Sequence, residues 1–114
     1  RLLEQLDAAG NLRFALGAAY DETAARALLA ELGLGEQGDK RVRDWSGGMK
    51  RRLALARALL APSDALALDE PCTGLDADNR AAAQRCVARA ARKKIVLLVS
   101  HEDDALTGAE VRLQ

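Results

Sequence analysis

The sequence predicts an α/β fold with a parallel sheet and flanking helices. Two apolar runs have the length of strands, Ala65–Leu68 and the β-branched Ile95–Val99. A helical pattern from Asp78 to about Ala91 separates them, and a helix is the usual connection between parallel strands. Both runs stop abruptly at polar residues, and ligands in such folds bind beyond the carboxyl ends of the strands.

The composition is that of a globular domain of ordinary size. The chain has 114 residues, of which 49% are hydrophobic, and its 17 basic and 17 acidic residues give zero formal net charge. This composition argues against disorder, and zero net charge removes any bulk argument for nucleic acid or an anionic membrane as partner. The two cysteines, Cys72 and Cys86, show no metal-ligand spacing. They predict reduced thiols in a cytosolic compartment.

The residues before the strands predict two clear helices. Residues 1–20 are weakly patterned and predict short helical turns, interrupted at Gly10 and Gly17. The first clear helix is Asp21–Leu32, with Asp21 as its N-cap and Gly33 as its stop. A polar loop over residues 33–44 follows. The inward face of this helix is predicted to contain Ala25, Leu28, Leu29 and Leu32.

The second clear helix runs from about Gly47 to Leu60. Its basic residues Lys50, Arg51 and Arg52 are interpreted as one solvated face. Its apolar stripe contains Met49, Leu53, Ala56 and Leu60. After the second strand, a short acidic helix from Glu102 to about Leu106 and a last strand near residues 111–113 are expected.

The start of the second helix could bind a phosphate. Ser46 stands where an N-cap belongs, and Gly47 and Gly48 occupy the first turn, although glycine costs about 1 kcal/mol per helical position relative to alanine. Backbone N–H groups at a helix start can bind an anion, and no Cβ obstructs its approach. The alternative is an ordinary capped helix start with a tight bend.

Polar residues after the two strands are the other candidates. Asp69 could hold Mg²⁺, mainly through water, and the adjacent Glu70 could polarise a water molecule; alternatively, the two acids form a solvated strand end. His101, the sole histidine, could donate a hydrogen bond to a phosphoryl oxygen, or it is a surface histidine. Cys72 lies beside the acids but is not expected to act as a nucleophile.

Four segments, taken together and in this order, resemble the ATP-binding cassette (ABC) ATPases. They are similar to the family signature, the Walker B strand, the D-loop and the switch histidine: WSGGMKRRLALARALL from Trp45, DALALDEP from Asp64, CTGLD from Cys72 and VSHE from Val99. The resemblance implies a partial P-loop NTPase (RecA-like) parallel sheet with flanking helices plus the ABC helical subdomain. Residues 1–60 would form the helical subdomain and signature helix, and residues 61–114 part of the α/β core.

The resemblance also implies roles for the matching residues. Asp69 would hold Mg²⁺, Glu70 would be the catalytic base, and His101 would contact the γ-phosphate. Ser46, Gly47, Gly48 and Met49 of the signature would contact ATP held by the opposite subunit, and Asp76 would belong to the loop that couples the two sites. The signature departs from the family pattern, which usually has Leu at the position of Trp45 and commonly Gln at that of Met49.

The implied function is that of the ATP-binding and hydrolysing subunit of an ABC transporter. Its cofactors would be ATP and Mg²⁺. Its partners would be a second nucleotide-binding domain and a transmembrane permease, with no nucleic acid. The expected location is cytoplasmic, peripheral on the cytoplasmic face of the membrane. The alternatives are a soluble ABC-type ATPase acting on nucleic acid or ribosomes, and a non-catalytic interaction module with the cassette shape.

Three family elements have no counterpart in this sequence. The P-loop pattern G-x-x-x-x-G-K-[ST] does not occur, and neither does a match to the Q-loop glutamine or the adenine-stacking aromatic. The chain is therefore expected to be the carboxyl-side portion of a cassette. Because the P-loop supplies most contacts to the β- and γ-phosphates, this chain alone is expected to bind ATP weakly and to have no meaningful turnover.

Overall fold

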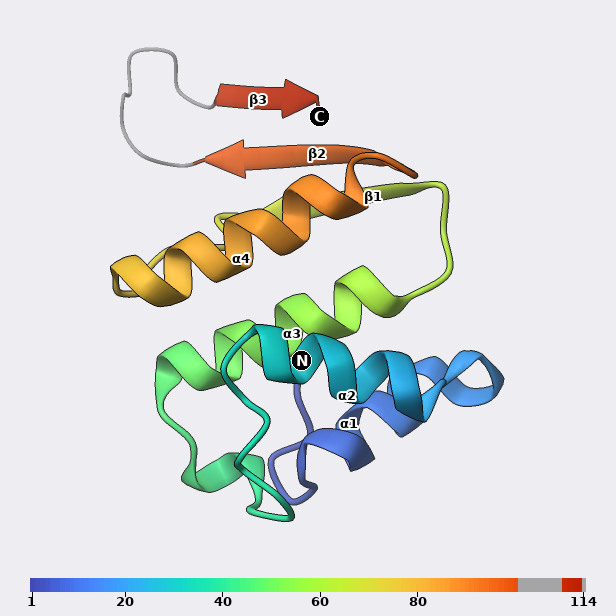
Figure 1. Cartoon of the computed structure of the whole chain (residues 1–114), viewed down its shortest axis with the longest axis vertical. Coiled ribbons are helices and arrows are strands. Elements are labelled where there is room, and N and C mark those ends of the chain that lie inside the picture. Colours follow the sequence, from blue (N-terminus) through green and yellow to red (C-terminus); the bar gives the residue numbers. More distant parts are fainter. Residues whose placement is uncertain (101–109, 114) are drawn as a thin grey trace. The chain divides into compact units, whose positions relative to one another are not determined.

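The computed structural model describes residues 1–100 and 110–113 (Figure 1). The chain forms two compact units, Arg1–Pro62 and Ser63–Gln114. The first unit is helical and the second contains the sheet. None of the described helices combines the length and the apolar character that crossing a membrane requires.

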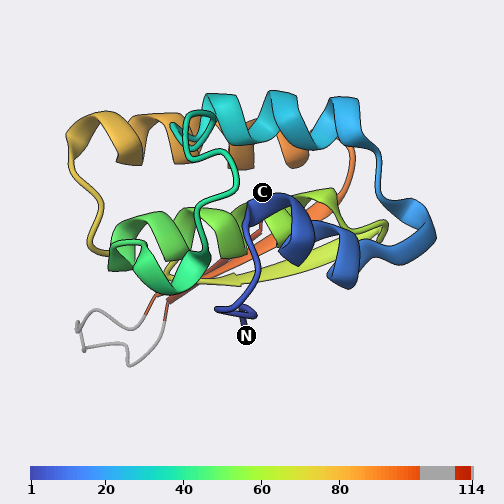
Figure 2. The same ribbon diagram turned by 90° about the horizontal axis from the view of Figure 1, so that it is seen from below.

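Unit 1 is a small helical assembly in which α3 packs against α1 and α2 (Figures 1 and 2). Its largest fully buried side chains are leucines and a valine, which form an apolar core. Its helices are α1 (Ala8–Leu16), α2 (Glu22–Glu31) and α3 (Gly47–Leu60), with 3-10 turns η1 (Gly17–Ala19) and η2 (Val42–Asp44).

Helix α1 continues through Gly10, so the predicted interruption at Gly10 is wrong. Gly10 lies inside α1, and its N–H donates to Oδ1 of the N-cap Asp7 over 2.7 Å. A Cβ at Gly10 would lie 3.1 Å from that oxygen and 3.1 Å from Cβ of Leu6, so glycine there permits a close approach. The predicted break at Gly17 is confirmed: α1 ends there, and Gly17 has a φ of 54°.

The capping residues of α2 are those that the sequence predicts. Oδ1 of Asp21 accepts hydrogen bonds from the N–H groups of Thr23 and Ala24, and Gly33 follows the helix with a φ of 77°. The expected polar loop over residues 33–44 is more structured than its composition suggests. It buries Leu34 and Val42, and η2 bonds to the amino-terminal segment through its backbone.

Unit 2 contains a three-stranded sheet with the order β1-β2-β3. Strands β1 and β2 are parallel, in a register that runs from Ala65↔Ile95 to Asp69↔Val99, and β3 is antiparallel to β2. Helix α4 connects β1 to β2 and lies on one face of the sheet (Figures 1 and 2). The elements are β1 (Ala65–Asp69), α4 (Ala77–Ala90), β2 (Ile95–Ser100) and β3 (Glu110–Leu113).

The predicted α/β class and its parallel strand pair are confirmed. The sequence pattern places Ala83, Cys86, Val87 and Ala90 on the inward face of α4; the first three are buried, and Ala90 is half-buried. A short apolar run such as Ala65–Leu68 predicts a buried parallel strand, but this prediction is wrong, because only Leu68 of β1 is buried. Within the described part of the sheet, β1 is an edge strand with β2 as its one neighbour. The expected helix at residues 102–106 lies outside the described residues.

Candidate functional site

The signature segment forms a capped helix start. Ser46 has extended backbone angles, and its Oγ accepts a hydrogen bond from the N–H of Met49 over 3.2 Å. This bond makes Ser46 the N-cap of α3, as predicted. The N–H groups of Gly47 and Gly48 belong to the first turn, so they have no partner within the helix. Ser46 and Gly47 are exposed, and Gly48 and Met49 are half-buried.

The space around Gly47 helps to separate the two interpretations of the glycine pair. Among the described residues, a Cβ placed on Gly47 would meet only Nη1 of Arg51, at 4.0 Å, and Gly47 does not have a positive φ. Neither packing within the described part of the chain nor backbone strain therefore requires glycine there. An ordinary cap would tolerate alanine, whereas approach of an external group to the backbone would not.

Two side chains next to this turn are buried, and the sequence predicted neither. The indole of Trp45 is 5% exposed, and its Nε1 has no hydrogen-bond partner among the described residues. Arg52 is 8% exposed, so the prediction that it belongs to a solvated basic face is wrong. Arg51 is exposed as predicted, and Lys50 forms an ion pair with Glu4 at 3.0 Å. Arg52 directly precedes Leu53, which lies on the inward side of α3. This position in the sequence was the signal that could have indicated burial of Arg52.

The acidic pair lies at the carboxyl end of β1. Asp69 is the last residue of the strand and is paired with Val99. The N–H of Glu70 donates to the carbonyl of Val99 over 2.9 Å, so the backbone stays tied to β2 for one residue beyond the strand. Both acids are thereby fixed beside the end of β2. His101 directly follows β2 but lies outside the described residues.

Glu70 has an unusual backbone conformation that the sequence did not predict. Its φ is 46°, the one positive φ at a non-glycine residue of the described chain. Such a conformation costs of order 1–3 kcal/mol and is concentrated at functional sites. Thr73 supports it locally, donating from Oγ1 to Oε1 of Glu70 over 3.4 Å and from its N–H to the carbonyl of Glu70 over 3.2 Å.

The donor set at this strand end fits a hydrated magnesium ion. The carboxylate of Asp69 is a hard oxygen donor on an exposed residue, and Mg²⁺ prefers oxygen and keeps several water ligands. Among residues 1–100 and 110–113, no three His, Cys, Asp or Glu side chains gather as a metal site.

Asp76 has a structural role in the described chain. It is the N-cap of α4: its Oδ1 accepts from the N–H of Asn79 over 2.8 Å, and its Oδ2 accepts from Nδ2 of the same residue over 3.3 Å. Residues Cys72 to Leu75 form the turn that leads to this cap, with Gly74 at a φ of 80°. The family resemblance assigns this turn to the coupling of two nucleotide sites. The cap at the start of α4 holds the carboxyl end of the turn.

The thiol of Cys72 has no activated character. Partial burial raises its pKa above the ordinary value of 9.0, and the charge of Arg80 opposes that shift without reversing it. A raised pKa leaves the thiol protonated at neutral pH, which agrees with the expectation that Cys72 does not act as a nucleophile, although the charge of Arg80 acts on it.

The candidate residues fall into two groups. Asp69 and Glu70 lie together at one end of the parallel strand pair in unit 2, with Asp76 later in the same unit. Ser46, Gly47, Gly48 and Met49 form one continuous turn in unit 1.

Comparison with curated proteins finds ATP-binding subunits. The chain is 41% identical over 108 residues to the aliphatic sulfonates import ATP-binding protein SsuB 1 of Rhizobium johnstonii, covering 90% of this chain and 39% of that protein. It is 48% identical over 83 residues to the Nod factor export ATP-binding protein I of Burkholderia orbicola, covering 68% of this chain and 27% of that protein. The chain thus spans well under half the length of these relatives.

Solved structures with the same fold include the RNase-L Inhibitor, with a TM-score of 0.68 and 28% identity over 90% of this chain and 21% of that one. A second is the complex of archaeal ribosomal stalk protein aP1 with the archaeal ribosome recycling factor aABCE1, with a TM-score of 0.69 and 28% identity, covering 90% of this chain and 20% of that one. The family model described as "ABC transporter" matches residues 1–73, well over half of the chain. The chain with the glycine-opened α3 and the acidic tip of β1 belongs to the ABC transporter family.

Proposed function

We propose that this chain forms the signature-bearing, carboxyl-side part of an ATP-hydrolysing subunit that drives a transporter. The observation that carries the proposal is the tip of β1. There Asp69 ends a parallel strand and Glu70 follows it, and the N–H of Glu70, whose backbone is strained, bonds to the carbonyl of Val99, two residues before His101 in the sequence. Unit 1 would supply the helical subdomain and signature helix, and unit 2 part of the α/β core.

The proposed chemistry is in-line transfer of the γ-phosphoryl group of ATP to water. The Glu70 carboxylate accepts a proton from the attacking water. The water oxygen bonds to the γ-phosphorus as the bond to the β–γ bridging oxygen breaks, and the products are ADP and phosphate. Asp69 would hold Mg²⁺ through water, and the ion supplies charge neutralisation at the phosphates. His101 is proposed to donate to a γ-phosphate oxygen.

The signature turn is proposed to act on ATP held by a second subunit. The exposed start of α3 offers backbone N–H groups, and among the described residues the nearest atom to a Cβ at Gly47 would be Nη1 of Arg51, at 4.0 Å. As the family resemblance implies, the nucleotide at this turn would be held by P-loop residues of another subunit. Asp76 would couple the two sites through the turn that it anchors.

The transport role is supported by the relatives, whose names are those of import and export ATP-binding proteins. The partners would be a transmembrane permease and a second nucleotide-binding domain. The subunit would then be peripheral on the cytoplasmic face of the membrane.

The decisive experiment measures ATPase activity of the complete subunit that contains this chain. We expect Glu70→Gln to lower kcat by at least about a hundredfold, because general-base catalysis contributes on that scale, while leaving the thermal unfolding temperature nearly unchanged. Glu36→Gln, at an exposed position of the loop after α2, is the matched control and should keep full activity. Equal activity of the two variants would refute the proposed role of Glu70.

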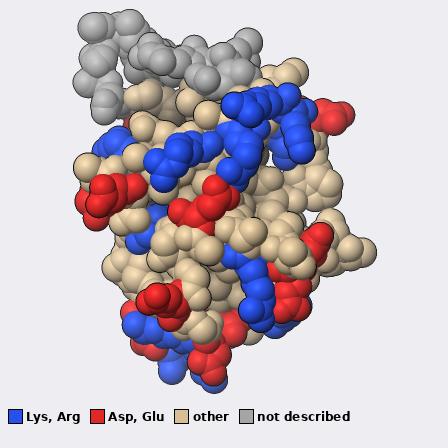
Figure 3. Space-filling view, in the orientation of Figure 1, with Lys and Arg blue, Asp and Glu red and all other residues tan. Residues whose placement is uncertain are grey.

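A second candidate function is a soluble ABC-type ATPase that acts on ribosomes or nucleic acid. Two solved structures with this fold are named for a ribonuclease inhibitor and a ribosome recycling factor. In addition, basic side chains gather over the α4 region (Figure 3), although the net charge of the chain is zero. The exposed basic residues of α4 and of the turn that follows it are Arg80, Arg85, Arg89, Arg92 and Lys93.

Affinity purification of the complete subunit distinguishes the two candidates. Transport predicts recovery with an integral membrane protein from detergent-solubilised membranes. Ribosome or RNA action predicts co-sedimentation with ribosomes that falls steeply as the salt concentration rises, and that weakens when Arg85 and Arg89 are replaced by Gln.

A further inference from the structure

Arg52 lies at the junction between the signature turn and the end of α2. Its Nη1 donates to the carbonyl of Leu32 over 2.8 Å in a buried contact, and its Nε donates to the carbonyl of Gly48 over 3.2 Å. Leu32 is the C-cap of α2, and Gly48 belongs to the first turn of α3. One planar guanidinium therefore bridges two elements whose sequence positions are far apart.

The bridge acts on backbone groups that define the end of one helix and the start of the other. The last carbonyls of α2 have no partner within that helix, and a cation near a helix carboxyl end is favourable. At Gly48 the same side chain holds the turn that carries the exposed N–H groups. The orientation of this turn is thereby fixed relative to α2.

The opposite side of the turn is held separately. The N–H of Val42 donates to the carbonyl of Leu6, and the N–H of Arg43 donates to the carbonyl of Glu4, each over 2.9 Å. The N–H of Trp45 then donates to the carbonyl of Val42 over 2.9 Å. The segment before Ser46 is thus anchored by backbone bonds, and Arg52 supplies the anchor on the α3 side.

Stability alone does not account for an arginine at this position. Burying a charge carries a desolvation cost, and apolar side chains of similar volume often replace buried charged groups without loss of stability. An apolar side chain, however, could not bond to two carbonyl oxygens at fixed positions. The guanidinium therefore fixes the position of the turn through directional hydrogen bonds.

We propose that Arg52 is a positioning residue, whose bonds to the carbonyls of Leu32 and Gly48 set the first turn of α3 for phosphate binding. The inference rests on the proposed function, in which the turn Ser46–Met49 contacts ATP of a second subunit. Arg52 itself does not contact the nucleotide.

The test compares three variants in the complete subunit: Arg52→Met, Arg52→Lys and the control Arg51→Met, which changes an exposed residue of the same turn. We expect Arg52→Met to lower kcat about tenfold or more, since small misplacements of binding groups have effects of this size. The KM for ATP should stay within about twofold, because the P-loop subunit holds the nucleotide. Arg52→Lys keeps the charge but lacks the planar fork, so we expect an intermediate kcat.

Hydrogen exchange supplies a readout that does not depend on activity. In Arg52→Met and Arg52→Lys, the amides of Met49 and Lys50, which bond to Ser46, should exchange faster than in Arg51→Met, while those of residues 24–30 in α2 should not. A kcat per folded subunit equal to that of Arg51→Met, or unchanged exchange at Met49 and Lys50, would overturn the inference. If Arg52→Met does not fold, Arg52→Lys decides by the same two criteria.

Glu70→Gln separates this inference from the proposed function. If Glu70→Gln remains active, the proposed function fails, and hydrogen exchange still decides whether Arg52 holds the turn. If Glu70→Gln is inactive but Arg52→Lys has full kcat and unchanged exchange, the proposed function stands and the positioning role of Arg52 fails.

Discussion

Packing in the part of the chain that the structure describes does not require glycine at position 47. A Cβ on Gly47 would meet no described atom closer than Nη1 of Arg51, at 4.0 Å, so alanine fits there without strain. We expect Gly47→Ala to raise the free energy of unfolding by up to about 1 kcal/mol and to lower the ATPase activity of the complete subunit. Denaturant titration and steady-state ATPase assays measure the two effects. Gly17→Ala, at a φ of 54°, should instead destabilise the chain.

The opposite signs of the two effects at Gly47 make the prediction specific. A stabilised variant with unchanged ATPase activity would show that no phosphate approaches the backbone at Gly47. The pair Ser46-Gly47 would then be an ordinary capped helix start.

Cys72 makes the stability of the chain depend on alkaline pH. Burial raises the pKa of its thiol above 9.0 in the folded chain, so the folded state holds the proton more tightly than the unfolded state. The resulting contribution to stability is complete below about pH 9 and is lost as the pH rises through the folded pKa. We therefore expect the loss of stability between about pH 7 and about pH 10 to be smaller in Cys72→Ala than in the wild type.

Chemical denaturation at these two pH values provides the measurement. Because tyrosine and lysine also titrate in this range, the comparison is between the two proteins and not between the two pH values alone. A wild type that loses no more stability than Cys72→Ala would contradict the raised pKa. In either case, ATPase activity of Cys72→Ala should match the wild type, since the thiol has no catalytic role.

Sequence reasoning at the residue scale succeeded where one residue type has one local role. The N-caps Asp21 and Ser46 were predicted because a short polar side chain directly before a helical pattern typically acts as the N-cap. Arg52 was missed because its partner, the carbonyl of Leu32, is 20 residues away in the chain. The positive φ of Glu70 was also missed, since glutamate has no preference for that conformation.

At the scale of elements, helix α4 depends on Asp76 for its start. Both carboxylate oxygens of Asp76 bond to Asn79, at its N–H and at its Nδ2. We expect Asp76→Ala to lower the stability of unit 2 by about 1 kcal/mol, the usual effect of losing an N-cap. Asp78→Ala, at an exposed position of the first turn, is the matched control and should have a smaller effect.

Asp76→Asn separates capping from a role in coupling the two sites. Asparagine caps helices about as well as aspartate, so the stability should be retained. If the negative charge of Asp76 also couples the sites, the variant will lose ATPase activity at normal stability. Loss of stability in Asp76→Asn would mean that the N-cap requires the charge.

The bounds of helices and strands were predictable where the apolar pattern is strong. They were less predictable where contacts between distant parts of the chain decide the local structure. The bounds of α3 match the prediction because its apolar stripe, its cap and Pro62 agree. The first turns were predicted as broken because Gly10 suggests a break, whereas the cap at Asp7 and the close approach to Leu6 keep α1 continuous. The turn η2 was missed since its backbone partners, Glu4 and Leu6, are distant in sequence.

At the scale of the whole molecule, the chain holds one part of the proposed catalytic machinery. It carries the acidic tip of β1 and the signature turn, but its sequence has no P-loop pattern. We expect the purified 114-residue chain to bind ATP weakly and to show no meaningful turnover, because P-loop backbone groups and the P-loop lysine supply most phosphate contacts. Turnover comparable to an intact cassette, and abolished by Glu70→Gln, would contradict this expectation.

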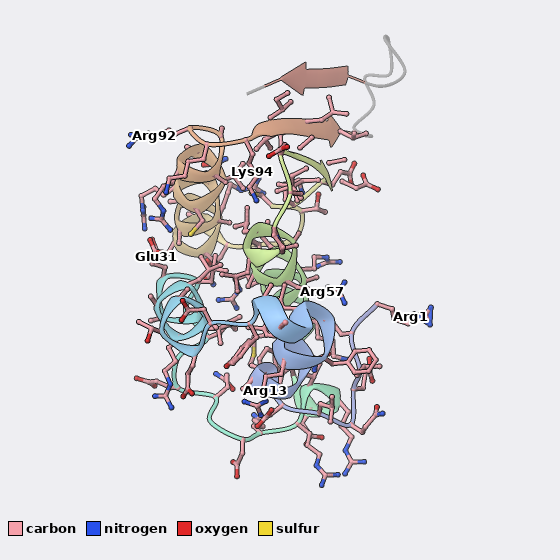
Figure 4. The ribbon with its side chains drawn as sticks, turned by 90° about the vertical axis from the view of Figure 1, so that its right-hand side faces the viewer. Arg1, Arg13, Glu31, Arg57, Arg92 and Lys94 are labelled. Atoms are coloured by element: carbon pink, nitrogen blue, oxygen red, sulfur yellow. The ribbon has the colours of Figure 1, made fainter. Side chains whose placement is uncertain are left out.

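Side-chain packing within unit 1 also connects distant parts of the chain. Arg57 of α3 donates from Nη1 to the carbonyl of Arg1 over 2.9 Å, and the two residues lie on the same side of the helical unit (Figure 4). Together with the ion pair between Lys50 and Glu4, this bond ties the first residues to the signature helix. Cooperative unfolding of unit 1 should therefore include its amino-terminal segment.

The sheet of unit 2 has an edge that favours self-association. In the described part of the sheet, β1 has a single neighbouring strand, and only Leu68 of its five residues is buried. Open strand edges pair with other chains, so we expect the purified chain to associate as its concentration rises.

Ala67→Lys places a charge on the exposed middle of β1 and should shift light scattering toward the monomer. Ala88→Lys adds the same charge on an exposed position of α4 and should not. A wild-type chain that stays monomeric at high concentration, or equal effects of the two variants, would exclude association through β1.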